Sequence, residues 1–263
     1  MDLDKYYTNK DTAQNCIRKM LDIVPIDAYF IEPSAGDGSF LFEYTKEAYD
    51  ILPENPVVQQ ADFLKVFNEK ENICFYGNPP FGKRNTLTKQ FISHCLSFNG
   101  AKWIAFILPM CFKKHTQQRI FPFEWSLVSE IILPVDSFTA KGNPYKIPCV
   151  FQVWEKESIL PDLRQKERTS FRNEHFSIST KVGDFFVMGA SPTTLKTPEN
   201  VPTNNRGYWL TTSLSFDNLQ SNLKSVPWEG YSSAGGGVSW WTKQDFINQY
   251  ERHFKIGEFN GQQ

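Results

Sequence analysis

The stretch Phe30-Ile-Glu-Pro-Ser-Ala-Gly-Asp-Gly38 decides the fold that we expect for this chain. It continues a short apolar run, residues 28–31, of the kind that forms a buried strand. The proline ends the strand, and the two glycines let the backbone turn tightly and approach a ligand because they carry no Cβ. Open parallel sheets bind ligands at the carboxyl ends of their strands, so this turn is the first candidate site.

Carboxylates on this turn indicate the charge of its ligand. Glu32 and Asp37 place acids on both sides of the glycine at position 36. They attract cationic groups and repel a pyrophosphate. The turn therefore favours a ligand with cationic groups, such as the sulfonium and the ammonium of S-adenosylmethionine.

Short apolar strands alternate with amphipathic helical segments over residues 8–154. Strands are expected at 28–31, 48–52, 57–61, 73–76, 103–108, 128–133 and 147–154, and helices at 8–21, at 86–98 and, in short form, from Ser39. This alternation predicts an α/β fold with a parallel sheet and crossover helices. Only a loop, 135–146, separates the last two strands, so we expect them to be antiparallel neighbours at one edge.

The texture of the sequence changes after Lys156, where polar residues, proline, serine and threonine dominate. We therefore predict a catalytic domain at 1–156 and a C-terminal region at 157–263, which is either a small extension or a reduced target-recognition region for the substrate. The glycine-rich stretch 232–237 in that region is expected to be a flexible loop, because it lacks the lysine of a phosphate-binding loop.

Composition limits the class of protein. Hydrophobic residues make up 40% and charged residues 22% of the 263 positions, which is typical of a soluble globular chain. The longest apolar run, Trp103–Leu108, is far shorter than the roughly 20 residues that span a bilayer, and the first residues are polar. The five cysteines form no C-x-x-C pair and the four histidines form no cluster. We expect a soluble cytoplasmic protein without a metal.

The net charge of −1 hides a segment without acids. No Asp or Glu occurs between Glu71 and Glu124. The cations of this segment are Lys83, Arg84, Lys89, Lys102, Lys113, Lys114 and Arg119. Such a stretch indicates a surface that faces phosphates, although a solvated face is the plainer explanation.

A second decisive stretch, Asn78-Pro-Pro-Phe81, follows the buried strand expected at 73–76. Two prolines cannot continue a ladder of hydrogen bonds, so the chain leaves the sheet in a stiff, extended form. The Asn78 side-chain oxygen and the Pro79 carbonyl can then both point at one NH₂ group, and Phe81 can cover the ring that carries it. A rigid turn with a capping asparagine is the structural alternative.

Taken in order, the segments Tyr7-Thr8, Glu32–Gly38, Ala61-Asp-Phe-Leu64 and Asn78–Phe81 resemble motifs X, I, III and IV of the amino-methyltransferases. Their order is similar to that of the gamma group of adenine-N6 DNA methyltransferases. Tyr49-Asp-Ile-Leu-Pro53 resembles motif II. The resemblance covers about residues 5–155 and leaves the C-terminal region unmatched.

The resemblance implies a seven-stranded class I methyltransferase sheet, Rossmann-like, with S-adenosylmethionine across its first strands. Thr8 and Glu32 would hold the methionine part, and Gly36 would allow its close approach. Asp50 would bind the ribose, while Asp62 with Phe63 would hold the adenine of the cofactor. The full implied set of cofactor-binding residues is Tyr7, Thr8, Glu32, Ser34, Ala35, Gly36, Asp37, Asp50, Ile51, Asp62, Phe63 and Asn78.

The same resemblance implies methylation of adenine N6 in nucleic acid, with DNA favoured over RNA. The catalytic residues would be Asn78, Pro79, Pro80 and Phe81. Four cations follow the fourth and fifth expected strands and would surround the target at the same sheet edge. We therefore expect Lys83, Arg84, Lys113 and Lys114 to bind nucleic-acid phosphates.

Three other functions share part of this pattern. The first is methylation of an amino group of adenine or guanine in RNA, because RNA would bind to a basic, aromatic surface as well as DNA would. Methylation of a glutamine amide in protein uses a similar Asn-Pro-Pro tetrapeptide, but the Tyr7-Thr8 motif and the segment without acids argue against it. A non-catalytic nucleic-acid-binding module that keeps the fold is the last alternative, and the intact Asn78, Phe81 and Gly36 argue against that one.

Overall fold

The computed structural model describes residues 6–140, 143–201, 203, 206–228 and 241–256. The chain divides into two compact units, residues 1–165 (unit 1) and 166–263 (unit 2). The glycine-rich stretch 232–237 lies outside the described residues.

Unit 1 continues past Lys156, where the texture of the sequence changes. Residues 157–165 return to the sheet edge, where the Leu163 amide donates to the Leu127 carbonyl at 2.8 Å. The Leu127 amide in turn donates to Asp162 Oδ1 at 3.0 Å, and Arg164 Nη1 donates to the Phe121 carbonyl at 3.1 Å. These contacts make residues 157–165 part of unit 1. By composition alone, this polar segment would be assigned to the C-terminal region.

Unit 1 is built on one seven-stranded sheet. Its strands are β2 (Tyr29–Glu32), β3 (Thr45–Asp50), β4 (Gln59–Gln60), β5 (Ile73–Gly77), β6 (Ala101–Pro109), β7 (Trp125–Ile132) and β10 (Cys149–Lys156). They lie in the order β4-β3-β2-β5-β6-β10-β7. Neighbours from β4 to β6 are parallel, whereas β10 is antiparallel to both β6 and β7. This order, with one reversed strand next to the edge, is that of the class I methyltransferase sheet and confirms the expected fold class.

The last two strands of the sheet are antiparallel neighbours, as predicted. The segment between them is more than a loop. It forms the hairpin β8 (Phe138–Ala140) and β9 (Asn143–Tyr145), and β8 pairs with β1 (Tyr7–Thr8). This small antiparallel sheet ties the start of the described chain to the connection between β7 and β10.

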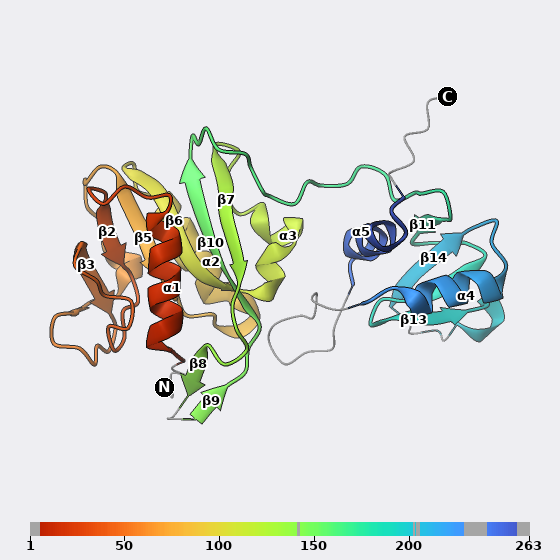
Figure 1. Cartoon of the computed structure of the whole chain (residues 1–263), viewed down its shortest axis with the longest axis horizontal. Coiled ribbons are helices and arrows are strands. Elements are labelled where there is room, and N and C mark those ends of the chain that lie inside the picture. Colours follow the sequence, from red (N-terminus) through yellow and green to blue (C-terminus); the bar gives the residue numbers. More distant parts are fainter. Residues whose placement is uncertain (1–5, 141–142, 202, 204–205, 229–240, 257–263) are drawn as a thin grey trace. The chain divides into compact units, whose positions relative to one another are not determined.

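Two helices cover opposite faces of the central sheet. On the α1 side (Lys10–Leu21), Met20 Sδ lies 3.7 Å from Cys74 Sγ of β5. On the α2 side (Thr86–Leu96), the ring of Phe63 lies 5.7 Å from both Phe91 and Phe75. Successive side chains of a strand point to opposite faces, so Cys74 and Phe75 each meet a different helix. Figure 1 shows α1 running along the near side of the sheet, next to β5 and β6.

The short helix expected from Ser39 is wrong, because residues 39–44 form turns. The glycine turn occupies the first half of the connection from β2 to β3, and the six residues that remain are too few for a crossover helix. Their aromatic rings pack onto the sheet instead: Phe42 lies 5.1 Å from Phe30 and 5.3 Å from Tyr76. A groove of about 570 Å³ is left between α1 and residues 38–42.

The remaining helical segments of unit 1 are short. They are η1 (Phe63–Lys65), η2 (Lys83–Asn85), η3 (Met110–Lys113) and α3 (His115–Gln118). Each of η1, η2 and η3 lies just beyond the carboxyl end of a parallel strand, β4, β5 or β6. The chain thus changes direction repeatedly at the one edge where ligands of such sheets bind.

Unit 2 has its own sheet and core. Its antiparallel strands lie in the order β11 (Ser177–Ser179), β14 (Gly207–Thr211), β12 (Phe185–Met188) and β13 (Ser191–Lys196). The turn η4 (Pro198–Asn200) follows β13, and the helices are α4 (Phe216–Ser225) and α5 (Lys243–Phe254). Buried Leu219 and Leu223 of α4 and Ile247 of α5 share one core with Leu210 of β14.

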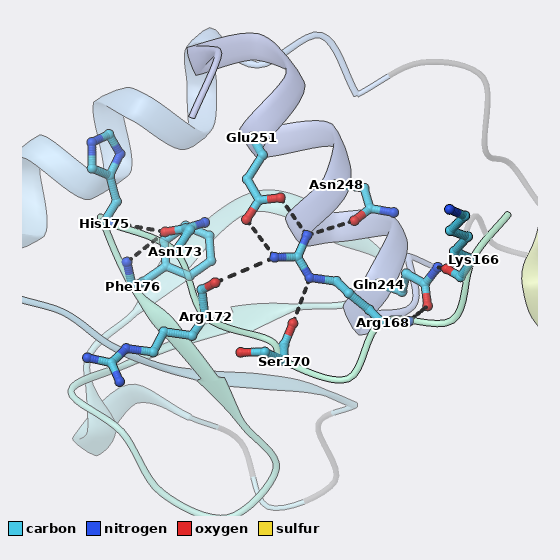
Figure 2. A network of polar contacts seen from close by, with 10 residues as sticks. All are labelled: Lys166, Arg168, Ser170, Arg172, Asn173, His175, Phe176, Gln244, Asn248 and Glu251. Atoms are coloured by element: carbon cyan, nitrogen blue, oxygen red, sulfur yellow. Dashed lines mark hydrogen bonds and ion pairs between the residues drawn. The ribbon is translucent and has the colours of Figure 1, made fainter. Parts of the chain in front are cut away.

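A buried polar network joins the start of unit 2 to its last described helix (Figure 2). The Arg168 guanidinium forms an ion pair with Glu251 of α5, in which Nη2 donates to Oε1 at 2.8 Å. It also donates to Asn248 Oδ1 at 2.9 Å and to the Ser170 carbonyl at 2.6 Å. The network therefore fastens residues 168–170 to α5.

Three findings bear on the class of protein, for the part of the chain that the structure describes. No helix there is long and apolar enough to cross a membrane. No group of three or more His, Cys, Asp or Glu side chains there could hold a metal ion. All five cysteines are free thiols, and four of them are buried.

Candidate active site

The end of β5 brings the two decisive stretches together. Gly77 is the last residue of β5 and has φ +125°, which only glycine adopts readily. A Cβ at this position would lie 2.2 Å from Glu32 Oε1 and 2.4 Å from Oε2. A side chain at position 77 would therefore displace the carboxyl group of Glu32, and glycine lets this carboxyl lie against the backbone just before Asn78.

Glu32 is almost completely buried, with 1% of its surface exposed. Burial raises the pKa of its carboxyl to about 8, and the negative charges of Asp50 and Asp37 act in the same direction. The Ser34 amide donates to Glu32 Oε1 at 3.2 Å and partly opposes this shift. The site thus holds a carboxyl group that would be stabilised as an anion by a cationic ligand.

Asn78 is fixed by two hydrogen bonds, and its side-chain oxygen takes part in neither of them. Its Nδ2 donates to Thr8 Oγ1 at 3.1 Å, and its backbone carbonyl accepts from Ser34 Oγ at 3.1 Å. Its Oδ1 is buried and has no hydrogen-bond partner among the described residues. A buried acceptor that no described residue uses therefore lies at this position.

The turn at Gly36 is fastened to the end of β3. Gly36 has φ +51°, and its amide donates to Asp50 Oδ2 at 2.9 Å. The other carboxylate oxygen of Asp50 accepts from the Leu52 amide at 2.8 Å. The Ala35 amide donates to the Tyr49 carbonyl at 2.8 Å. Asp37 accepts from the Ser39 hydroxyl at 2.7 Å, so it stabilises the turn itself.

Tyr7 links the N-terminal strand to the loop after β3. Its hydroxyl donates to Glu54 Oε1 at 2.5 Å, and the Glu54 amide donates to the Gly36 carbonyl at 3.0 Å. Burial, followed by the hydrogen bond to Glu54, raises the pKa of Tyr7 to about 12. The strand β1 is therefore linked to both halves of the site: Tyr7 reaches the glycine turn through Glu54, and Thr8 bonds directly to Asn78.

The remaining implied cofactor residues occupy different environments. Ile51 is 58% exposed beside the Asp50 turn. Asp62 caps η1 by accepting from the Leu64 amide at 3.2 Å and pairs with Lys65 at 3.0 Å. Phe63 is only 2% exposed, and its ring packs among other aromatic rings on the α2 face of the sheet. That ring is part of the core in this structure.

The prolines lead the chain out of the sheet and into a strained turn. Pro79 is buried, and the Pro80 carbonyl accepts from Thr88 Oγ1 at 3.2 Å. Phe81 is half-buried against the core on the α1 side. Arg84 and Asn85 follow with φ values of 55° and 60°, a region that residues other than glycine adopt at some cost. Asn85 Nδ2 lies 3.1 Å from Cys111 Sγ, which joins this turn to η3.

The four cations expected to bind phosphates differ in how available they are. Lys83 and Arg84 are exposed next to Phe81. Lys113 forms an ion pair with Glu130 of β7, and both side chains are largely buried. Lys114 is 9% exposed. Glu130 lies outside the acid-free segment in the sequence, but the sheet places β7 close to η3, so Lys113 is already neutralised within the chain.

Two residues of the site, Gly77 and Glu54, are not predicted from the sequence. Gly77 ends a buried strand, and its position directly before Asn78 was the only signal for its role. Glu54 lies in a turn that carries no motif, and only the fold brings it to Tyr7, 47 positions away. A carboxylate in a loop gives no sequence signal of this kind.

No protein-family model and no curated protein matches this sequence. Among solved structures, the chain is similar to the modification subunit of a "putative type I restriction enzyme" from Vibrio vulnificus, at 15% identity and a TM-score of 0.44. That match covers 60% of this chain and 46% of the subunit, so the chain spans less than half of that protein.

Two further solved structures cover more of their own length. A "putative RNA methyltransferase" from Pyrococcus horikoshii matches at 14% identity and a TM-score of 0.46, over 59% of this chain and 88% of its own. The 23S rRNA methyltransferase ErmE matches at 15% identity and a TM-score of 0.44, over 94% and 99%. Likenesses this distant carry no functional argument, and the fold class rests on the order and direction of the strands.

Proposed function

We propose that this chain is an S-adenosylmethionine-dependent methyltransferase that acts on the N6 amino group of adenine in nucleic acid, with DNA as the first substrate to test. Asn78 Oδ1 carries the proposal, because it is a buried acceptor without a partner among the described residues. Leaving such an acceptor unpaired costs on the order of 1–3 kcal/mol unless a ligand supplies a donor. An amino group of the substrate supplies that donor.

The residues around Glu32 fit the cationic cofactor. The pKa of the Glu32 carboxyl is raised because the group is buried near two further acids, and an ammonium group would relieve both effects. Gly36 exposes backbone to a close approach, and Asp50 already faces this turn. When bound, S-adenosylmethionine supplies an electrophilic methyl group. Glu32, Gly36 and Asp50 are the residues that we propose to hold it.

The chemistry that remains for the chain is positioning. The amino nitrogen of adenine is a poor nucleophile because its lone pair is delocalised into the ring. Asn78 Oδ1 and the Pro79 carbonyl accept its two hydrogens and favour a more pyramidal nitrogen with an available lone pair. Well-oriented reactants can gain on the order of 7–11 kcal/mol, so alignment provides most of the acceleration. No general base is needed for the transfer itself, because the proton becomes acidic only after the nitrogen is alkylated. The thioether S-adenosylhomocysteine would leave as the methyl–sulfur bond breaks, and the proton would pass to solvent.

Phe81 and the neighbouring cations suit a base in nucleic acid. A base stacked on the Phe81 ring would gain roughly 1–3 kcal/mol, which offsets part of the cost of extruding it from a duplex. Lys83 and Arg84 are exposed within three positions of that ring and would meet the flanking phosphates. We propose that unit 1 carries the catalysis and that the C-terminal region contributes to recognition of the target.

Transfer of labelled methyl groups from S-adenosylmethionine to matched pools of DNA, RNA and protein tests the proposal. We expect label in DNA, in the N6 amino group of adenine. Asn78→Ala should lower the rate by on the order of 10²–10³-fold, the loss typical of removing one group that stabilises a transition state. Its free energy of unfolding should fall by only about 1 kcal/mol, because Oδ1 has no partner among the described residues and the one side-chain hydrogen bond that is lost is the bond from Nδ2 to Thr8.

Asn15→Ala, in α1, is the matched control and should keep the wild-type rate. Within the described part of the chain, its side chain forms one hydrogen bond, in which Oδ1 accepts from Arg18 on the surface. Label in RNA alone would move the substrate to RNA adenine. Label in protein alone would contradict adenine as the target, and absence of label from all three pools would favour the non-catalytic binding module.

A further inference from the structure

The orientation of the Asn78 amide decides whether it can accept a hydrogen bond from an amino group. An asparagine amide is nearly symmetric in shape, and a half-turn about its last bond exchanges the oxygen acceptor for the nitrogen donor. With Nδ2 towards the substrate, two NH₂ groups would face each other without an acceptor. The proposed reaction therefore requires something that holds Oδ1 towards the substrate.

Thr8 is the residue that contacts this amide. Its Oγ1 accepts from Asn78 Nδ2 at 3.1 Å, across 70 positions of the chain. Thr8 is 6% exposed and is held in β1, which pairs with β8. Ser34 Oγ donates to the Asn78 carbonyl at 3.1 Å, so the backbone of Asn78 is fixed as well. With the backbone held, the hydroxyl of Thr8 is the group that selects the orientation of the amide.

A hydroxyl can accept or donate, so Thr8 alone leaves two arrangements open. In one, Oγ1 accepts from Nδ2 and Oδ1 stays available. In the other, the amide is turned and the Thr8 proton goes to Oδ1. A ligand that accepts the Thr8 proton removes the second arrangement, because the hydroxyl can then only accept from Asn78. No described residue accepts the Thr8 proton through a hydrogen bond, so this position is available to a ligand.

We infer that Thr8 is a positioning residue that couples the cofactor site to Asn78. The carboxylate of a bound cofactor accepts the Thr8 proton, Thr8 Oγ1 then accepts from Asn78 Nδ2, and Asn78 Oδ1 is held towards the amino group of the substrate. This inference rests on the proposed function. It adds that cofactor binding prepares the acceptor before the substrate arrives, through one hydroxyl group.

The test uses S-adenosylhomocysteine, which carries the same carboxylate and transfers no methyl group. The side-chain amide signals of Asn78 are identified by their loss in Asn78→Ala and are followed in the free and bound full-length protein by NMR. In the wild type we expect the bound ligand to shift these signals and to slow their exchange with water. In Thr8→Val, which keeps the shape and lacks the hydroxyl, this response should be lost.

Methyl transfer gives the second measurement. Thr8→Val should lower kcat by on the order of a hundredfold, the effect expected when a reacting group is slightly misplaced. Thr8→Ser retains the hydroxyl and should restore both the NMR response and most of the rate. Thr139→Val is the matched control, since Thr139 lies opposite Tyr7 in β8 and should keep the wild-type behaviour.

The outcomes separate this inference from the proposed function. If the wild type binds the ligand and transfers methyl groups while the Asn78 signals do not respond, the coupling through Thr8 is wrong and the methyltransferase stands. If Thr8→Val weakens ligand binding, and this weaker binding fully accounts for the lost rate and the lost NMR response, Thr8 is a simple cofactor ligand. That result would also overturn the coupling. Absence of ligand binding and of methyl transfer in the wild type would overturn both.

Discussion

Two buried polar clusters, one in each unit, use their hydrogen-bonding groups differently. Around Arg168 in unit 2, the guanidinium is paired with Glu251 and also donates to Asn248 and to the Ser170 carbonyl. Around Asn78 in unit 1, one amide group is bonded and Oδ1 is left over. Buried polar groups in native proteins are nearly always paired, so an unpaired one requires an explanation. Among the described residues, Gln117 Oε1 and Asn173 Nδ2 are also buried without a partner, and Asn78 Oδ1 is the one of the three that lies in the candidate site. The Arg168 ion pair holds structure, and Asn78 Oδ1 is where an external partner can bind.

Breaking the satisfied cluster should have the largest effect. Glu251→Gln leaves the Arg168 charge buried without its counter-ion, which typically costs 3–5 kcal/mol of stability. The loss should be confined to unit 2 and can be measured by hydrogen exchange in urea, from peptides of α5 and residues 166–176. Unit 1 peptides serve as the internal reference.

Arg252→Gln is the matched control in the same helix. Its guanidinium is exposed and, among the described residues, donates to Gln249 alone, at 3.3 Å, so its loss should change stability by less than about 0.5 kcal/mol. Equal, small effects of Glu251→Gln and Arg252→Gln would show that the buried ion pair does not hold unit 2 together.

The pH dependence of unit 1 sharpens the comparison, because Glu32 is a buried carboxyl that forms no ion pair with any residue that the structure describes. Its pKa is raised from 4.5 to about 8, so between these values the folded state keeps a proton that the unfolded state has lost. The folded state then binds more protons, and stability falls as the pH rises, by about 1.4 kcal/mol for each pH unit. The contribution is fully present below the unfolded pKa and is lost above pH 8.

Glu32→Gln removes this titration while it keeps the size of the side chain. Urea unfolding of wild type and variant at several pH values between 5 and 9, followed through hydrogen exchange of β2 and β5, should give curves that diverge as the pH rises. The variant should be the more stable protein at the alkaline end. Parallel curves would show that Glu32 is ionised at neutral pH and that it already has a cationic partner.

A smaller effect is expected from substitutions of the basic residues in unit 1. These residues, like the two clusters, differ in whether a partner within the chain already uses them. Lys113 is paired with Glu130, whereas Lys83 and Arg84 are exposed. Lys83→Glu combined with Arg84→Glu should weaken binding to nucleic acid and lower the slope of log affinity against log salt by about 2. Binding of S-adenosylhomocysteine should not change.

Lys113→Gln is the comparison variant for this experiment. It should leave the salt slope unchanged, because the charge of Lys113 is neutralised by Glu130. Fluorescence anisotropy with a labelled oligonucleotide at several salt concentrations measures both variants. A slope that falls for Lys113→Gln and stays constant for the double variant would reverse our assignment of the phosphate-facing residues.

The sequence predicts the elements of unit 1 better than the residues that fill its connections. Each of the seven expected strands overlaps a strand of the central sheet. Strands that are apolar and buried along most of their length, such as β5, β6 and β10, give the clearest signal. The weakest signals come from β3, which carries polar residues, and from β4, which is the exposed pair Gln59–Gln60. The hairpin β8–β9 was missed, since strands of three residues carry no periodic signal. The helix from Ser39 failed because helical propensity cannot overcome a connection that leaves only six residues after the glycine turn.

The sequence by itself determined the local geometry of the candidate site. Proline and glycine restrict or free the backbone of their own residues, so the stiff exit after Asn78 and the tight turn at Gly36 follow from residue type. Only the tertiary structure decided which groups have partners. Thr8 reaches Asn78 across 70 positions, Glu130 neutralises Lys113 from a neighbouring strand, and the ring of Phe63 lies in the core. Burial and pairing are set by contacts between distant segments, and no local pattern encodes them.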